Sequence, residues 1–141
     1  MRILMFHVDY FKCEITEKGR SKIVEEYSSP KTETKEALII LSSVEKQDEV
    51  NPERIAQNAV KEIINLAEKV KTKNILLHPF AHLFGELSTP QTAIQVLKIV
   101  ESELIQKGFN TIRTPFGWFN TLEIKAKGHP LSRVARIIKL N

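Results

Sequence analysis

The sequence contains a single cysteine, Cys13, among 141 residues, and this excludes an internal disulfide framework. A chain without disulfides suits a reducing compartment, so we expect it to be cytoplasmic. No apolar stretch is long enough to span a membrane, and we expect no membrane partner. Asp9, Lys12 and Glu14 interrupt residues 1–20, so this segment lacks the apolar pattern of a secretory signal peptide.

Three glycine-rich signatures of common enzyme classes are also missing. The sequence has no G-x-x-x-x-G-K-[ST] loop, no G-x-G-x-x-G and no G-x-S-x-G. These loops bind phosphates through backbone N–H groups or expose a nucleophilic serine on a tight turn. Their absence argues against nucleotide hydrolysis and against the common serine-hydrolase arrangement. The sequence places no histidine beside Cys13, which we therefore interpret as a structural thiol.

What is present is typical of one globular domain. Hydrophobic residues make up 42% of the chain and charged residues 27%, and 141 residues are enough to bury a substantial core. The net charge of +4 is compatible with an RNA or nucleotide partner but does not by itself establish one. We find no internal repeat and no low-complexity segment.

Five stretches have the apolar or alternating pattern of β-strands. They are Arg2–Tyr10, Ala37–Glu45, the run Ile75–Leu77 that ends at His78, Phe109–Arg113, and a stretch that begins at Trp118. In the last of these, alternate residues share one face of the strand, namely Asn120, Leu122, Ile124 and Ala126. Lys18-Gly19 indicates a hairpin that returns on the first strand as far as Tyr27, and Ser28–Lys35 is expected to be a polar loop.

Three segments carry helix signals. Asn51-Pro52-Glu53 supplies an N-cap, a proline at the first helical position and an acidic residue near the positive end of the dipole, and predicts a helix to about Val70. Thr89-Pro90 begins a second helix, and Gly108 lies just past its end. Gly128-His129-Pro130 turns the chain into a third helix. Its apolar side would consist of Leu131, Val134, Ala135 and Ile138.

The order of these elements predicts a single α/β domain with a mixed β-sheet packed by about three helices. On the third helix, Arg133, Arg136 and Lys139 recur at threefold spacing and form a basic stripe opposite the apolar side. This stripe is either a solvated face or a surface that meets phosphates.

His78 and His82 stand four residues apart with Pro79 between them. On a helix this spacing would put both imidazoles on one face, but a proline disfavours the helical conformation for the residue before it. No third ligand lies at a recognisable spacing. We therefore expect no metal site and interpret His78 as a structural residue at the end of its strand.

Three segments at the ends of predicted strands are unusual: Ser43-Val44-Glu45, Pro79–His82 and Pro115–Trp118. In open α/β sheets, ligands bind beyond the carboxyl ends of the strands. Two loops of the form Pro-Phe-small would bring aromatic walls and backbone N–H groups together, as in an apolar pocket with main-chain hydrogen bonding. The alternative is that the Pro-Phe pairs only plug the ends of the core.

Six short motifs, in order, resemble the N-terminal editing domain of archaeal threonyl-tRNA synthetases, whose fold is similar to that of D-aminoacyl-tRNA deacylases. They are HVDY at His7–Tyr10, SSVEK at Ser42–Lys46, NPE at Asn51–Glu53, PFAHL at Pro79–Leu83, PFGW at Pro115–Trp118 and KGHPL at Lys127–Leu131. The resemblance covers essentially the whole chain. It implies a D-aminoacyl-tRNA deacylase-like fold, with residues 1–141 as an editing domain at the N-terminus of a longer synthetase chain.

The resemblance implies hydrolysis of seryl-tRNA that the synthetase has wrongly made on tRNA(Thr). The partners would be the acceptor end of tRNA(Thr), with Arg133 and Arg136 as weak contacts, and the seryl moiety. The residues that would bind substrate are Val44, Glu45, Pro79, Phe80, Ala81, Phe116, Gly117, Trp118 and Phe119. The fold family commonly dimerises through its sheet, so a homodimer is expected. Editing would need no cofactor, and ATP and zinc would serve only the synthetase portion.

The chain departs from its relatives at two positions. Related domains often carry Tyr-Tyr-Lys after the PFG motif and a glutamate in the last helix, where this sequence has Trp118-Phe119-Asn120 and Arg133. Neither Asn120 nor Arg133 can accept a proton as a general base. We therefore predict substrate-assisted hydrolysis, in which the tRNA terminal ribose hydroxyl activates or orients water. Asn120 and His82 would act as positioning groups.

Two alternatives stay open. A free-standing D-aminoacyl-tRNA deacylase would share the fold and select chirality, although the PFAHL and KGHPL motifs favour the editing domain. A catalytically inactive tRNA-binding module would also explain the missing lysine and glutamate.

Overall fold

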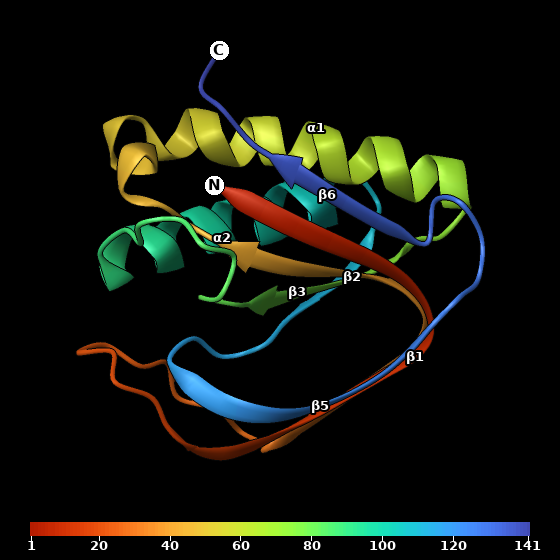
Figure 1. Ribbon diagram of the computed structural model, residues 1–141, viewed down its shortest axis with the longest axis horizontal. Helices are drawn as coiled ribbons and strands as arrows, with labels where there is room; N and C mark the ends of the chain where they lie inside the picture. Colours follow the sequence, from red (N-terminus) through yellow and green to blue (C-terminus); the bar gives the residue numbers. More distant parts are fainter.

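The sheet is organised around strand β1 (Arg2–Lys18), in a computed structural model that describes residues 1–141 (Figure 1). On one side, β1 pairs antiparallel with β2 (Lys31–Ser43) along most of its length. On the other side, its first residues pair with β6 (Arg133–Ile137) and its remainder with β5 (Trp118–Ala126), both antiparallel. Because β1 curls strongly, β5 and β6 run in different directions although they share one of its edges.

β3 (Asn74–Pro79) and β4 (Asn110–Arg113) extend the sheet beyond β2 by parallel pairing, which gives the order β4-β3-β2-β1-β5. Helices α1 (Pro52–Val70) and α2 (Pro90–Gln106) are the crossovers that parallel strands require, and both lie on one face of the sheet (Figure 1). A 3₁₀ helix, η1 (Lys46–Val50), leads from β2 into α1. No helix in the structure combines the length and the apolar character needed to cross a membrane.

Two of the three predicted helix starts are confirmed. The Asn51 side chain accepts a hydrogen bond from the Arg54 N–H at 3.1 Å, and Pro52 takes the first helical position. In α2, the Thr89 hydroxyl oxygen accepts from the Thr92 N–H at 3.3 Å. These caps are local in sequence, and for this reason the sequence alone reveals them.

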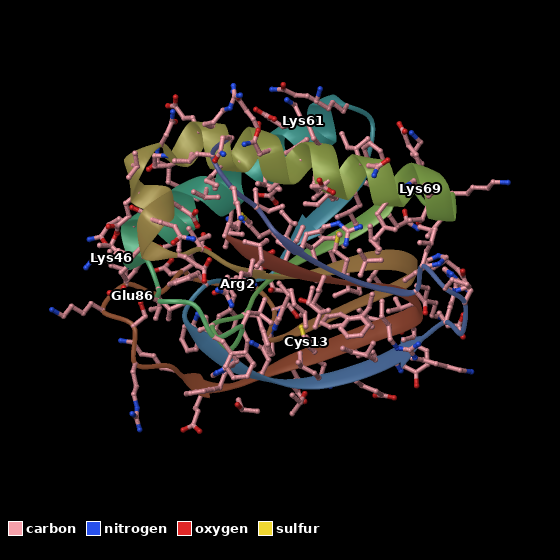
Figure 2. All side chains as sticks on the ribbon, turned by 45° about the horizontal axis from the view of Figure 1, so that its top comes forward. Arg2, Cys13, Lys46, Lys61, Lys69 and Glu86 are labelled. Carbon is pink, nitrogen blue, oxygen red and sulfur yellow. The ribbon has the colours of Figure 1, made fainter.

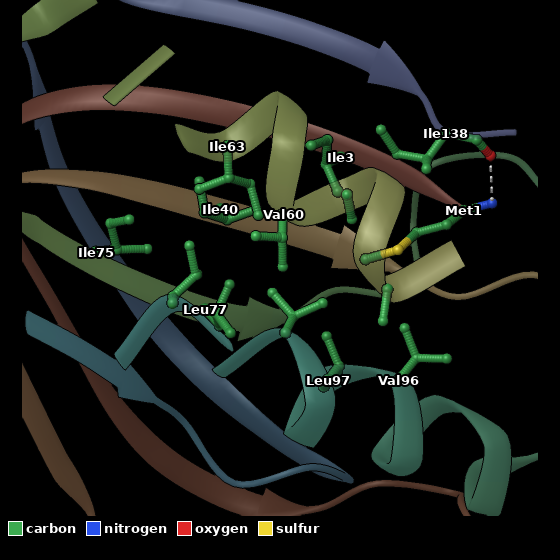
Figure 3. Close-up of a cluster of buried hydrophobic side chains, with 14 of the residues drawn as sticks. Met1, Ile3, Ile40, Val60, Ile63, Ile75, Leu77, Val96, Leu97 and Ile138 are labelled. Atoms are coloured by element: carbon green, nitrogen blue, oxygen red, sulfur yellow. Dashed lines mark hydrogen bonds between the residues drawn. The ribbon is translucent and has the colours of Figure 1, made fainter. Parts of the chain in front are cut away.

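Alternate residues of β2 serve two separate cores. Leu38 and Ile40 face the helices and belong to a cluster of 22 buried residues, part of which Figure 3 shows among the strands, α1 and α2. Ile39 and Leu41 face the concave side and belong to a second cluster of 7 buried residues. Cys13 lies in this second cluster (Figure 2), where burial raises the pKa of its thiol and makes it poorly reactive.

The segment predicted as a third helix is strand β6. Its apolar residues fit a helical spacing, but β5 leaves the edge of β1 from Arg2 to Phe6 unpaired, and Arg133–Ile137 pairs with it. Pairing satisfies backbone groups that would otherwise be left without partners, and this long-range gain decides the conformation. The sheet is therefore packed by two α-helices rather than about three.

The predicted basic stripe is also wrong, because it depends on that helix. In a strand, side chains alternate between faces, so Arg133 and Arg136 point to opposite sides of the sheet. Arg136 faces α1, where its Nε atom lies 3.6 Å from a Glu62 carboxylate oxygen. The exposed Arg133 lies next to the turn that precedes β6 and is separate from Arg136.

The predicted hairpin after Lys18-Gly19 is different in the structure. Residues 19–30 contain no strand, and β2 is the strand that returns on β1. β2 begins at Lys31, inside the segment predicted as a polar loop. Lys31–Lys35 forms an exposed ribbon with β1, and the charged side chains of such a ribbon give it the composition of a loop.

Candidate active site

A cavity of about 430 Å³ opens beyond the carboxyl ends of β2 and β3, where α/β sheets commonly bind ligands. Its walls are the end of β2, the end of β3 with the loop after it, the start of β5 with the turn before it, and the first turns of α2. Residues 19–21 complete it. The predicted site residues that line it are Val44, Pro79, Phe80, Ala81, His82, Phe116, Gly117, Trp118, Phe119 and Asn120.

Glu45 does not line the cavity. Its buried carboxylate lies 3.4 Å from the N-terminal ammonium group of Met1 and 3.1 Å from the Arg2 Nε atom. The backbone N–H of Glu45 donates to the Asp48 carboxylate at 2.7 Å, and this carboxylate also binds the Met1 ammonium group. Glu45 therefore holds the end of β2 against the start of β1 and takes no part in the cavity wall.

Main-chain hydrogen bonds hold the loop after β3 against the end of β2. The Phe80 N–H donates to the Ser42 carbonyl at 2.8 Å, and the Ser88 N–H donates to the Val44 carbonyl at 3.1 Å. The Phe80 ring is partly buried against the concave core, and its centroid lies 5.2 Å from that of the His82 imidazole. The His82 side chain is exposed.

Side chains and main-chain hydrogen bonds together hold the turn before β5, and the Glu25 N–H donates to the Phe116 carbonyl at 3.0 Å. The Glu25 carboxylate accepts hydrogen bonds from both terminal nitrogens of the Arg113 guanidinium group and from the Phe116 N–H at 3.0 Å. Glu101 accepts from the Arg113 Nε atom at 3.1 Å, and the Trp118 indole N–H donates to the Glu25 carbonyl at 2.7 Å. We call residues 19–27, which Glu25 fastens to this turn, the strap.

The strap and the turn touch closely at glycines. Gly117 has a φ of +95°, and a Cβ atom there would lie 2.6 Å from the Val24 side chain. The Gly19 N–H donates to the Gly117 carbonyl at 2.8 Å. Only glycine combines this φ with so close an approach. The strap thus fixes the Phe116-Gly117 backbone, which forms one wall of the cavity.

His78 is a buried structural residue at the base of the cavity. Its Nδ1 atom lies 2.8 Å from the Thr114 hydroxyl oxygen, which joins β3 to the chain just before the Phe116 turn. Burial lowers the pKa of His78 to about 4, so its imidazole is neutral at neutral pH. No group of three or more His, Cys, Asp or Glu side chains is placed to hold a metal ion.

Asn120 lies in the cavity wall on the same face of β5 as Leu122, as the alternation predicts. Its side-chain amide donates to the Trp118 carbonyl at 3.3 Å, and this leaves its carbonyl oxygen free to accept. No aspartate, glutamate or lysine lines the cavity, and Arg20 is its one arginine. The site therefore offers backbone groups, hydroxyls, imidazoles and an amide within largely apolar walls.

Sequence reasoning singled out the segment Ser43-Val44-Glu45 but did not place Ser43 among the substrate-binding residues, and it did not find the strap. Ser43 lines the cavity, and its buried hydroxyl has no hydrogen-bond partner. The signal for Ser43 was present, since Ser42-Ser43 interrupts an apolar strand at its carboxyl end. The strap had no local signal, because its position depends on an ion pair between residues 25 and 113.

Nearly the whole sequence matches known proteins. A family model described as the archaea-specific editing domain of threonyl-tRNA synthetase matches residues 1–138. The chain is 45% identical over 138 residues to the threonine–tRNA ligase of Methanocaldococcus jannaschii and 44% identical over 140 residues to that of Methanobrevibacter smithii. Each of these matches covers 98% of this chain but only 22% or 23% of the relative. The chain thus spans about a fifth of the length of the curated relatives it matches.

Proposed function

The chain belongs to the family of archaea-specific editing domains of threonyl-tRNA synthetase, and we propose that its cavity hydrolyses L-seryl-tRNA(Thr). The observation that carries the proposal is the cavity beyond β2 and β3, whose volume of about 430 Å³ is typical of a small-molecule site. Both Pro-Phe loops contribute to it, together with Val44 and Asn120.

The chemistry of serine and threonine explains why such a reaction is needed. The two amino acids differ by one methyl group, which a binding pocket discriminates by only about 10–200-fold. A second site that admits serine and excludes threonine by its size multiplies the two selections. In this chain, the small side chain of Ala81 and the absent side chain of Gly117 leave room for the seryl group in the cavity.

The hydrolysis we propose is assisted by the substrate. Water adds to the ester carbonyl carbon, the ester C–O bond breaks, and the released ribose oxygen takes a proton, which yields serine and free tRNA. No carboxylate or lysine lines the cavity, so the vicinal hydroxyl of the terminal ribose is the group that orients or activates the water. Backbone N–H groups stabilise the oxyanion, and Asn120 and His82 hold the reactants in place.

Deacylation of seryl-tRNA(Thr) by Asn120→Ala and His82→Ala tests this mechanism. Each variant is expected to keep measurable activity, whereas a tRNA whose terminal ribose lacks the vicinal hydroxyl is expected to lose more activity than either variant. A loss of more than a thousandfold from Asn120→Ala would contradict the claim that the substrate supplies most of the catalysis. Hydrolysis of D-aminoacyl-tRNA in preference to L-seryl-tRNA would instead favour a deacylase that selects chirality.

One observation favours a second function, that of an inactive tRNA-binding module. The cavity lacks the side-chain base that the Tyr-Tyr-Lys pattern would supply, because Asn120 stands in its place. Tight binding of the tRNA acceptor end with no deacylation above buffer would support this second function. The tRNA partner, a homodimer and a cytoplasmic location are part of the proposal. Light scattering of the purified chain tests the homodimer.

A further inference from the structure

Ser43 has a buried hydroxyl with no partner in the protein. It is the last residue of β2, its exposure is 2%, and it lines the cavity. Its neighbour Ser42 is equally buried, but the Ser42 hydroxyl donates to the Ile40 carbonyl at 3.2 Å. The Ser43 oxygen has no such bond. The two adjacent serines therefore differ, since one is satisfied within its own strand and the other is not.

An unpartnered buried hydroxyl destabilises a protein, and an alanine at the same place would avoid the penalty. Such a group is understandable where a ligand completes its hydrogen bonding. Ser43 lines the cavity beyond β2 and β3, so a molecule bound there is the nearest group outside the protein that could complete the hydrogen bonding of this hydroxyl.

The burial of Ser43 indicates which part of the substrate its hydroxyl would contact. The side chains of His82 and Phe119 are exposed and Asn120 is half-buried, whereas Ser43 is almost fully enclosed. The tRNA end must remain near the open side of the cavity, together with the ester carbonyl that water attacks. The amino group is positively charged, and one neutral hydroxyl does not compensate its burial. The remaining polar group of a seryl ester is its side-chain hydroxyl.

We propose that the Ser43 hydroxyl hydrogen-bonds the side-chain hydroxyl of the bound seryl group and so makes the site selective for a hydroxylated amino acid. This inference rests on the proposed function. A hydroxyl can donate and accept, so Ser43 and the seryl group satisfy one another. An alanyl group would leave Ser43 unpaired, and sites that hydrogen-bond a substrate hydroxyl reject analogues that lack it. Exclusion of threonine by size and rejection of alanine by hydrogen bonding are then separate properties of one pocket.

The test compares two substrates in the wild type and in two variants of Ser43. We expect Ser43→Ala to lower kcat/KM for L-seryl-tRNA by about tenfold to a hundredfold, because the seryl hydroxyl then lacks a partner. For L-alanyl-tRNA, the same variant is expected to equal or exceed the wild type. Ser43→Cys keeps the shape of the side chain but replaces the oxygen with the larger, more weakly hydrogen-bonding sulfur, and its ratio of seryl to alanyl activity should fall between the other two.

Ser42→Ala is the matched comparison at a buried neighbour whose hydroxyl is already bonded. Any disturbance of the strand end should change both substrates by the same factor in this variant. If Ser43→Ala also changes both substrates equally, or changes neither, the assignment of Ser43 is wrong.

Binding of non-hydrolysable seryl- and alanyl-adenosine analogues separates this inference from the proposed function. If the wild type binds the seryl analogue more tightly and Ser43→Ala removes the difference, the inference stands even when deacylation is absent. If the wild type deacylates seryl-tRNA but Ser43→Ala keeps the full preference for the seryl analogue, only the inference fails. If the wild type neither binds the seryl analogue nor deacylates seryl-tRNA, both fail.

Discussion

The two Pro-Phe loops that line the cavity differ in how far side chains help to hold them. The loop after Pro79 continues the sheet, because main-chain hydrogen bonds to Ser42 and Val44 fix it while His82 and Phe84 remain exposed. The turn after Pro115 also receives main-chain hydrogen bonds, but in addition it depends on the buried ion pair between Glu25 and Arg113. Main-chain pairing tolerates changes of side chain, whereas an ion pair does not. The first loop should therefore be robust to substitution and the second fragile.

Removal of the ion pair should have the largest effect. Glu25→Ala leaves Arg113 largely buried without its main partner and frees the Phe116 N–H, and loss of one partner of a buried pair costs about 3–5 kcal/mol. Urea unfolding should show this loss, together with reduced deacylation. The adjacent Glu26→Ala, whose side chain is exposed, is the control and should change little. Equal stability of the two variants would show that the Glu25 carboxylate does not hold the turn.

His78, which lies at the base of both loops and contacts Thr114, should make the stability of the protein depend on pH. A histidine whose pKa is lower in the folded than in the unfolded state stabilises the protein fully above the unfolded pKa, and this stability falls as the pH falls. With a folded pKa of about 4 against 6.5 unfolded, about 3 kcal/mol should be lost between pH 6.5 and 4.

Chemical unfolding at several pH values measures this loss. His78→Gln keeps a polar side chain near Thr114 but cannot titrate, so its stability should depend less on pH in this window. Identical pH dependence in the wild type and in His78→Gln would refute the prediction.

A methyl group at Gly117 should lower the free energy of unfolding by less than loss of the ion pair does. Gly117→Ala combines an unfavourable φ with a Cβ atom 2.6 Å from Val24, and we expect a loss of about 1–3 kcal/mol. Gly108→Ala is a matched control, since Gly108 has a φ of +91° but nothing within 4 Å of the new Cβ atom. The difference between the two melting curves isolates the contact between the strap and the turn. If both variants lose the same stability, that contact contributes nothing.

The smallest effect is expected in the loop after Pro79. Phe84 is 98% exposed and has a φ of +69°, a conformation that asparagine adopts more readily than phenylalanine. Phe84→Asn should leave deacylation unchanged and change stability by less than about 1 kcal/mol, in the stabilising direction. A large loss of activity from this substitution would mean that side chains also hold the first loop.

The same contrast explains what the sequence could predict. Helices α1 and α2 begin at caps within a few residues of their starts, and the two Pro-Phe loops directly follow or precede apolar strands. These signals are local, so both helices and ten of the 22 residues that line the cavity were predicted. The comparisons also confirm the resemblance carried by the six motifs.

Features that depend on distant partners could not be predicted. β6 has the apolar spacing of a helix and becomes a strand only because the edge of β1 is free there. Glu45 follows Val44 in the sequence, but its carboxylate pairs with Met1 and Arg2, and Glu45 does not line the cavity. Glu25 showed no pattern at all, because its importance comes from Arg113 and Phe116.

The pairing of β1 has a consequence for how the protein acquires its structure on the ribosome. β1 is synthesised well before β6, the strand that completes its edge. The Met1 ammonium group likewise donates a hydrogen bond to the Ile138 carbonyl at 3.3 Å (Figure 3). The nascent chain must therefore keep an apolar strand with an open edge until translation passes β6. Such contacts between distant residues slow folding and expose strands to aggregation. We expect nascent-chain protection of β1 to appear late and in one step.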